Sequence, residues 1–297
     1  MPEPTTITAH GGHALAVLFS PDGKTLLSAG MDSKIKLWSA PDWKDAGTFE
    51  GHDKSVNSLD LSPDGSTLVT GSTDKTVKLW SFPKGEVVRT LTGHKNTVST
   101  ARFSPDGKHV ASASYDGKVK LWNAETGEEL ATLSGHAKNV GSVAFSRDGR
   151  TLASAGLGDR IVLWKVPSGE RIGELAGHEV AVGSLVLSPD GKRLASAGYE
   201  GTVRLWSTRD WSEERRIDLD GKGQFPLAFS PDGRTLAVAM EKKVELWSLK
   251  TWERLETLDV PAKGVYAVAF SPDGRLLASA SADKRVRVWE LDPSKKG

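Results

Sequence analysis

Tryptophan recurs at a nearly constant interval along this chain. Seven of its ten tryptophans are spaced 42, 42, 42, 42, 41 and 42 residues apart, at Trp38, Trp80, Trp122, Trp164, Trp206, Trp247 and Trp289. A repeat of about 40–45 residues with strand-like content is typical of one four-stranded blade. A single blade cannot bury both of its faces, so neighbouring blades must cover each other. The repeat therefore predicts an all-β fold, a seven-bladed β-propeller that forms one domain over residues 1–297.

Within each repeat, strand-like segments alternate with turn sequences. In the third repeat, alternating apolar residues indicate a strand at 98–103, followed by a Ser-Pro-Asp-Gly turn at 104–107. A second strand is predicted at 109–114 and a hairpin turn at 115–117. A third strand at 118–122 and a turn at 126–128 then lead into a short fourth strand.

The two ends of the chain share one blade in this scheme. The segment after Trp289 is too short for a fourth strand, whereas residues 5–8 align with the segment that precedes a Gly-His pair in the next repeat. We therefore expect the N-terminal strand to complete the last blade, which closes the ring and removes an exposed sheet edge.

Three short elements recur at fixed offsets: a Gly-His pair, an Asp at the hairpin turn and a Trp at the end of a strand. In these elements the chain resembles the WD-repeat (WD40-type) β-propellers over essentially its whole length. The Asp of the family's Trp-Asp dipeptide is replaced in every repeat, by Ser39, Ser81, Asn123, Lys165, Ser207, Ser248 and Glu290. The Ser-Pro-Asp-Gly turns look like those of prokaryotic members, many of which are attached to signalling or regulatory domains.

The resemblance also implies a polar brace inside each blade. A buried indole N–H needs an acceptor and a buried imidazole needs two partners; in the family, a chain of Trp, Ser or Thr, His and Asp meets these needs. Blades 1 to 3 carry complete sets: His10, Ser28, Asp32 and Trp38; His52, Thr70, Asp74 and Trp80; His94, Ser112, Asp116 and Trp122.

The other four blades depart from this brace. Blade 4 has Gly158 at the Asp position with Asp159 one residue late, blade 5 has Glu200, and blade 7 has Pro261 in place of the His. Blade 6 carries none of the polar partners, so we expect an apolar solution there.

A candidate interaction surface follows from the same alignment. In WD-repeat proteins the face with the Gly-His loops and Asp turns is the usual docking surface, and three positions per blade point to it: the third and fifth residues after the His, and the residue before the turn Asp. None of these positions is charged, although 26% of the chain is. Charge depletion with aromatic and Met enrichment is typical of an interface core.

We therefore expect a protein or peptide partner to contact an apolar set, most of which should form one continuous arc, with binding that depends weakly on salt. The set is Leu15, Met31, Tyr115, Tyr199, Phe225, Met240 and Tyr266. Two alternatives stay open. These residues could only fill the mouth of the channel, or the protein could be an enzyme or small-ligand binder that uses the central channel.

Other functional classes receive little support. The chain has no cysteine, and five of its seven histidines occupy the repeated structural position, so we expect no metal site, no cofactor and no enzymatic activity. A net charge of +1 predicts no nucleic-acid binding, and the absence of a signal peptide or apolar span predicts a cytoplasmic protein away from membranes. We also expect the protein to be a monomer. Trp43, Trp211 and Trp252, five residues after a blade Trp, are expected to cover a turn on the opposite face. A second docking patch on that face stays open as an alternative.

Overall fold

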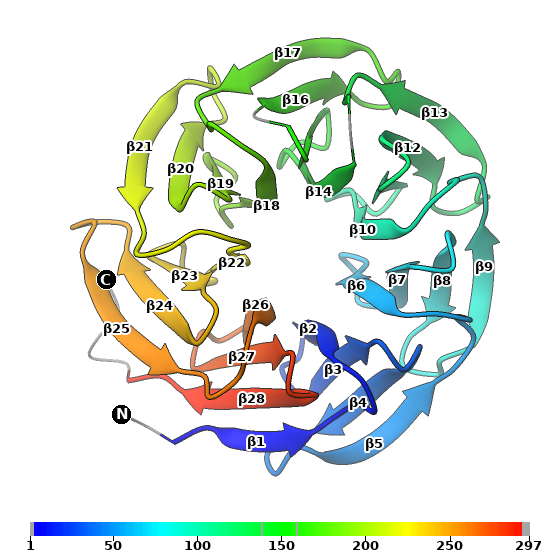
Figure 1. Cartoon of the computed structure of the whole chain (residues 1–297). Helices are drawn as coiled ribbons and strands as arrows, with labels where there is room; N and C mark the ends of the chain where they lie inside the picture. Colours follow the sequence, from blue (N-terminus) through cyan, green and yellow to red (C-terminus); the bar gives the residue numbers. More distant parts are fainter. Residues whose placement is uncertain (1–2, 138, 159, 293–297) are drawn as a thin grey trace. The chain divides into compact units, whose positions relative to one another are not determined.

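The computed structural model of the chain describes residues 3–137, 139–158 and 160–292. Within these ranges 28 strands form seven four-stranded antiparallel sheets, and no helix is present (Figure 1). The described ranges accordingly contain no helix that could cross a membrane. The chain divides into two compact units, Met1–Val56 with Gln224–Gly297 and Asn57–Gly223. The prediction of a single domain stays a prediction.

The first unit holds three sheets, which we call blades 1, 6 and 7. Blade 1 consists of β2 (Ala14–Phe19), β3 (Thr25–Gly30), β4 (Ile35–Ser39) and β5 (Lys44–Phe49). Blade 6 consists of β22 (Leu227–Phe229), β23 (Thr235–Ala239), β24 (Lys243–Ser248) and β25 (Arg254–Asp259). Blade 7 consists of β26 (Val265–Phe270), β27 (Leu276–Ser281), β28 (Arg285–Glu290) and β1 (Thr5–Thr8).

The second unit holds blades 2 to 5. Blade 2 consists of β6 (Val56–Leu61), β7 (Thr67–Ser72), β8 (Val77–Ser81) and β9 (Val87–Leu91), and blade 3 of β10 (Val98–Phe103), β11 (His109–Ser114), β12 (Lys118–Asn123) and β13 (Glu129–Ser134). Blade 4 consists of β14 (Val140–Phe145), β15 (Thr151–Gly156), β16 (Arg160–Lys165) and β17 (Arg171–Ala176). Blade 5 consists of β18 (Val182–Leu187), β19 (Arg193–Gly198), β20 (Thr202–Ser207) and β21 (Glu213–Asp218).

The strand pattern follows from burial and from the turn chemistry. In blade 3 the second strand, β11, is buried at every position after the first, whereas the fourth strand, β13, is mostly exposed. Between the first two strands, the Gly107 N–H donates to the Ser104 carbonyl and Gly107 has a φ of +72°. Glycine adopts this left-handed conformation without steric cost, which explains the Gly at the end of the Ser-Pro-Asp-Gly turn.

The N-terminal strand completes the last blade, as predicted. β1 pairs antiparallel with β28, with Thr5 opposite Val288 and Ile7 opposite Val286 (Figure 1). The Ile7 side chain is buried in the cluster that joins blades 7 and 1. Seven four-stranded antiparallel blades, the last completed by the N-terminal strand, confirm the predicted fold class, a seven-bladed β-propeller.

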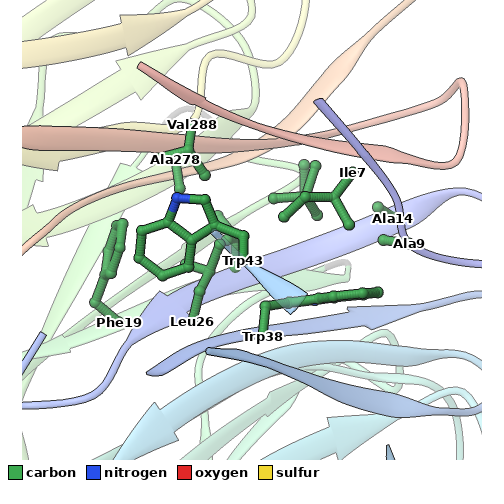
Figure 2. Packing of buried hydrophobic residues seen from close by; sticks show 12 residues of the cluster. Ile7, Ala9, Ala14, Phe19, Leu26, Trp38, Trp43, Ala278 and Val288 are labelled. Carbon is green, nitrogen blue, oxygen red and sulfur yellow. The ribbon is translucent and has the colours of Figure 1, made fainter. Parts of the chain in front are cut away.

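Trp43, which was expected to cover a turn on the opposite face, is buried between blades 1 and 7. Figure 2 shows its indole among Phe19 and Leu26 of blade 1 and Ala278 and Val288 of blade 7, and the residue is only 7% exposed. Its φ is +53°, where the equivalent residues of blades 2 to 4 are glycines with φ between +72° and +79°. A left-handed Trp is costly, so burial between two blades must hold it in place.

Candidate functional site

The polar brace forms in blade 3 as the sequence predicts. The Trp122 indole N–H donates to Ser112 Oγ over 2.8 Å, and Ser112 Oγ lies 2.8 Å from His94 Nε2. On the other side of the ring, His94 Nδ1 lies 2.9 Å from an Asp116 carboxylate oxygen, which also accepts the backbone N–H of Lys95. Blade 1 repeats this chain from Trp38 through Ser28 and His10 to Asp32. In blade 2 the Trp80 indole donates to Thr70, and His52 is buried.

The protonation state of the blade 3 brace follows from its surroundings. Burial lowers the pKa of His94 more than Asp116 raises it, so the imidazole is neutral at pH 7. The Nδ1–H then donates to Asp116, and Nε2 accepts the hydroxyl proton of Ser112. Burial alone would raise the pKa of Asp116, but hydrogen bonds from the Lys95 backbone and His94 outweigh it and hold the pKa below its ordinary value.

The same atoms have the order of a Ser-His-Asp catalytic triad, yet the arrangement cannot act as one. A catalytic serine needs access to substrate and an oxyanion hole. Ser112 has no exposed surface, and its Oγ is already occupied by the Trp122 indole and His94. The brace therefore joins the strands of a blade instead of presenting a nucleophile.

Blades 4 and 5 carry altered braces. In blade 4 His136 contacts Ser154, which also accepts the Trp164 indole N–H, while Asp159 lies outside the described residues. In blade 5 Glu200 takes the place of Asp and lies 2.5 Å from His178 Nδ1. The second carboxylate oxygen of Glu200 is buried without a hydrogen-bond partner, so the longer side chain fits this position less well than Asp does.

The expectation that apolar residues replace the polar brace in blade 6 is wrong. The Trp247 indole N–H donates to a carboxylate oxygen of Glu245 over 3.1 Å, and Glu245 forms ion pairs with Lys243 and Arg254. The Glu245 side chain is 1% exposed, and these hydrogen bonds outweigh burial and lower its pKa. A buried carboxylate with three donors replaces the Ser-His-Asp chain, because a carboxylate two residues before the Trp can reach the indole along one strand.

Blade 7 replaces the missing histidine with an arginine. Arg287, 1% exposed, donates to both carboxylate oxygens of Asp283 and to Ser281 Oγ. Asp283 thus keeps a hydrogen-bond donor although Pro261 stands at the His position. Ser279, the hydroxyl of this blade's brace, is buried without a partner. Arg287 and Glu245 both lie two residues before the blade Trp. This position is not part of the repeated pattern from which the brace was predicted.

In blades 1 and 7 the predicted contact positions lie near one another. Met31 is 49% exposed, and Leu15 and Tyr266 are partly exposed. The Tyr266 hydroxyl lies 3.3 Å from His13 Nδ1, and the two rings are stacked with centroids 5.7 Å apart. Tyr266 belongs to β26 and His13 precedes β2, so this contact links the last blade to the first.

Two of the predicted contact residues do not reach the surface. Phe225 is 3% exposed and Met240 is 5% exposed, so neither is available to a partner. Blade 6 has a shorter first strand and a hairpin one residue shorter than its neighbours, and the apolar side chains at these positions are buried instead of displayed. At the corresponding positions of the other six blades, every residue is at least partly exposed.

A groove lies beside the contact between His13 and Tyr266. Its volume is about 660 Å³, and it is lined by His13, Lys242, Pro261, Ala262, Lys263, Ala282 and Asp283. The two lysines were not among the positions that the alignment selected. Asp283 is already paired with Arg287, so the groove presents positive charge beside small apolar side chains.

The second unit displays two of the predicted residues. Tyr115 is 41% exposed at the hairpin turn of blade 3, and Tyr199 is partly exposed at the equivalent turn of blade 5. Between them in sequence, Leu157 is 47% exposed at the turn of blade 4.

Across the described residues there is no group of three or more His, Cys, Asp or Glu side chains that could hold a metal ion.

Comparison with known proteins identifies the repeat. A 42-residue segment is 45% identical to Protein MAK11 of Saccharomyces cerevisiae, and it covers 14% of this chain and 10% of that protein. The chain thus matches only a small part of this relative's length. The family profile described as WD domain, G-beta repeat matches residues 2–39, 43–81, 85–123, 127–165, 169–207 and 252–290. The stretch between the last two matches, residues 208–251, contains the first three strands of blade 6, whose brace differs most. The chain belongs to the WD domain, G-beta repeat family.

Proposed function

We propose that this protein is a non-enzymatic scaffold that binds a protein or peptide on the face formed by its Gly-His loops and Asp turns. Proteins of this family commonly serve as interaction scaffolds. The observation that carries the proposal is the surface of blades 7 and 1, where Tyr266 stacks on His13, a lining residue of an open groove, and the Met31 N–H donates to the His13 carbonyl. An aromatic anchor near a concave surface is where binding energy concentrates in protein interfaces.

The composition of this surface supports a macromolecular partner over a small substrate. Catalysis needs convergent ionisable groups with shifted pKa values. Around the groove the titratable groups are His13, Lys242, Lys263 and Asp283, and Asp283 is held by Arg287. The triad-like atoms of the braces are buried away from any substrate. The alternative, an enzyme or ligand binder that uses the central channel, therefore has less support.

The decisive experiment compares partner capture by matched variants of the full chain. Tyr266→Ala and Met31→Ala should each weaken binding by more than about 1 kcal/mol, because exposed anchors dominate interface energies. Ser55→Ala should bind like the unmodified protein. Phe225→Ala is not a suitable test, since a buried side chain changes stability before it changes contacts.

Unchanged melting temperatures would show that the variants remain folded. The two lysines of the groove also change the expected salt dependence: a partner seated there should bind moderately more weakly as salt is added. A partner whose affinity changes with neither Tyr266→Ala nor Met31→Ala would contradict the proposal.

A further inference from the structure

The groove beside His13 opens where blade 7 lacks a brace histidine. In blades 1 and 3 the side chains of His10 and His94 are buried against the carboxylate of the turn Asp. Pro261 takes this place in blade 7 and is exposed, and its ring has no N–H to donate to Asp283. Both residues instead line the groove. The groove thus lies between the loop and the turn that the imidazole joins in blades 1 and 3.

Backbone hydrogen bonds fix the loop that carries Lys263. The Val260 N–H donates to the Lys242 carbonyl, and the Gly264 N–H donates to the Glu241 carbonyl, each over 2.8 Å. These bonds join the loop to the hairpin turn of blade 6, so the backbones of the two groove lysines are held together. A loop that is ordered before binding loses less conformational entropy when a ligand binds.

The two groove lysines are available to a ligand. Lys242 and Lys263 are exposed, and the side chain of neither forms a hydrogen bond or an ion pair with any residue that the structure describes. Asp283 also lines the groove, but its charge is offset by the buried Arg287. Glu241, which precedes Lys242 in sequence, does not line the groove. The groove therefore carries a net positive charge.

The segments that the structure does not describe at the two ends of the chain offer no acidic side chain to this groove. Residues 293–297 contain two lysines and no acidic residue, and residues 1–2 contain no charged side chain. The described chain ends at Asp292, past the end of β28, whereas Asp283 of the groove precedes the start of this strand. The complement of the two lysines is therefore sought in a partner.

We propose that the partner segment bound at this surface is an acidic peptide, with Asp or Glu side chains paired to Lys242 and Lys263. The proposal rests on the function proposed above and specifies the chemistry of the partner at the same site. Charge complementarity of this kind selects among partners and speeds their encounter. Carboxylates suit the ammonium groups of lysine, whereas phosphate is often bound by the paired N–H groups of arginine, and Arg287 is already engaged by Asp283.

A display library of random nonapeptides supplies the probes, with the full chain as bait. The selected peptides should be enriched in Asp and Glu over the starting library. The tightest one is synthesised unchanged, as the acidic peptide, and with Asn and Gln in place of Asp and Glu, as the amide peptide. By fluorescence anisotropy at low salt, the amide peptide should bind about tenfold more weakly. Most of this difference should be lost in about 1 M salt, where the Debye length is about 3 Å.

Lysine variants show whether the groove binds the carboxylates. Lys242→Ala and Lys263→Ala should each weaken the acidic peptide about threefold, and the double variant about tenfold. The amide peptide should bind the double variant as it binds the unmodified protein, because it has no charges to pair. Lys250→Ala removes an exposed lysine at the turn between β24 and β25 of the same blade, and it should change neither affinity.

The outcomes separate this proposal from the one on which it rests. Tyr266→Ala should weaken the acidic and amide peptides alike and leave the ratio of their affinities unchanged. Selected peptides that are not acidic but lose affinity in Tyr266→Ala would overturn the acidic partner and keep the surface. An acidic peptide whose affinity is unchanged in the double lysine variant would also overturn it.

Two further results would count against more than the lysines. Peptides that respond to neither Tyr266→Ala nor the double lysine variant, or a library without any binder, would contradict the surface and the acidic partner together. Single-stranded DNA should not displace the acidic peptide. Displacement that is lost in the double lysine variant would overturn the choice of a peptide as the partner.

Discussion

In blades 1, 3 and 5 the brace histidine contacts an acidic side chain through its second ring nitrogen. We expect Asp116→Ala to reduce the free energy of unfolding by about 1–3 kcal/mol, because His94 and the Lys95 N–H lose their acceptor while His94 stays buried. Glu241→Ala is the matched control at the turn of blade 6, where the side chain is exposed. Urea denaturation of both variants measures the difference. Equal losses of unfolding free energy in the two variants would mean that the brace does not stabilise the turn.

His136 should make stability depend on pH. Burial, aided by Arg171, lowers its pKa from 6.5 to about 4. Above pH 6.5 the histidine is neutral in both the folded and unfolded states, so it contributes no pH dependence there. As the pH falls from 6.5 towards 4 the unfolded state binds a proton that the folded state does not, so the free energy of unfolding falls. In His136→Gln this decrease should be shallower, as measured by urea denaturation at several pH values; identical slopes would contradict the assignment.

At the scale of single elements, Trp43 combines backbone strain with burial. Removing a buried Trp costs about 3–5 kcal/mol, and relief of the left-handed backbone returns about 1–2 kcal/mol. We therefore expect Trp43→Gly to destabilise the protein by about 2 kcal/mol, as measured by thermal or urea denaturation. Trp252→Gly, at the equivalent turn of blade 6, should cost less because Trp252 is partly exposed. A stabilised Trp43→Gly variant would show that strain outweighs packing.

Sequence predicts the elements better than it predicts their polar contacts. The alternation of apolar residues in segments such as β10 and the turn residues of each repeat are local properties of the sequence, so the blades could be placed from it. The brace of blade 3 could also be predicted, because its offsets repeat. The roles of Glu245 and Arg287 could not be predicted, because each replaces a missing partner through a contact that forms only in the folded strand. Phe225 and Met240 were misplaced because the shortening of blade 6 changes which side chains its surface displays.

For the molecule as a whole, the N-terminal strand is the element on which blade 7 depends. Deletion of residues 2–9 should lower the melting temperature and promote aggregation, because β28 would lose one of its two partner strands and become an open edge. Calorimetry and size-exclusion chromatography measure both effects. Ile7→Asp should destabilise the full chain in the same direction, whereas Thr6→Asp, exposed on the same strand, should not. A deletion variant that melts like the unmodified protein would show that blade 7 is stable with three strands.

The pairing of Thr5 with Val288 also sets the order of events when the protein is made. The ribosome makes residues 5–8 before residues 285–290, at about 5–20 residues per second. The N-terminal strand must then wait on the order of 15–60 s for its partner to be synthesised. Blades 1 to 6 have all their strands on the nascent chain before that time, but blade 7 does not. Its completion is a contact of high sequence separation, which makes it an intrinsically slow step of folding. Until it occurs, the newly made chain carries one unpaired strand, β1, and an open edge at β28, both of which chaperones would have to shield.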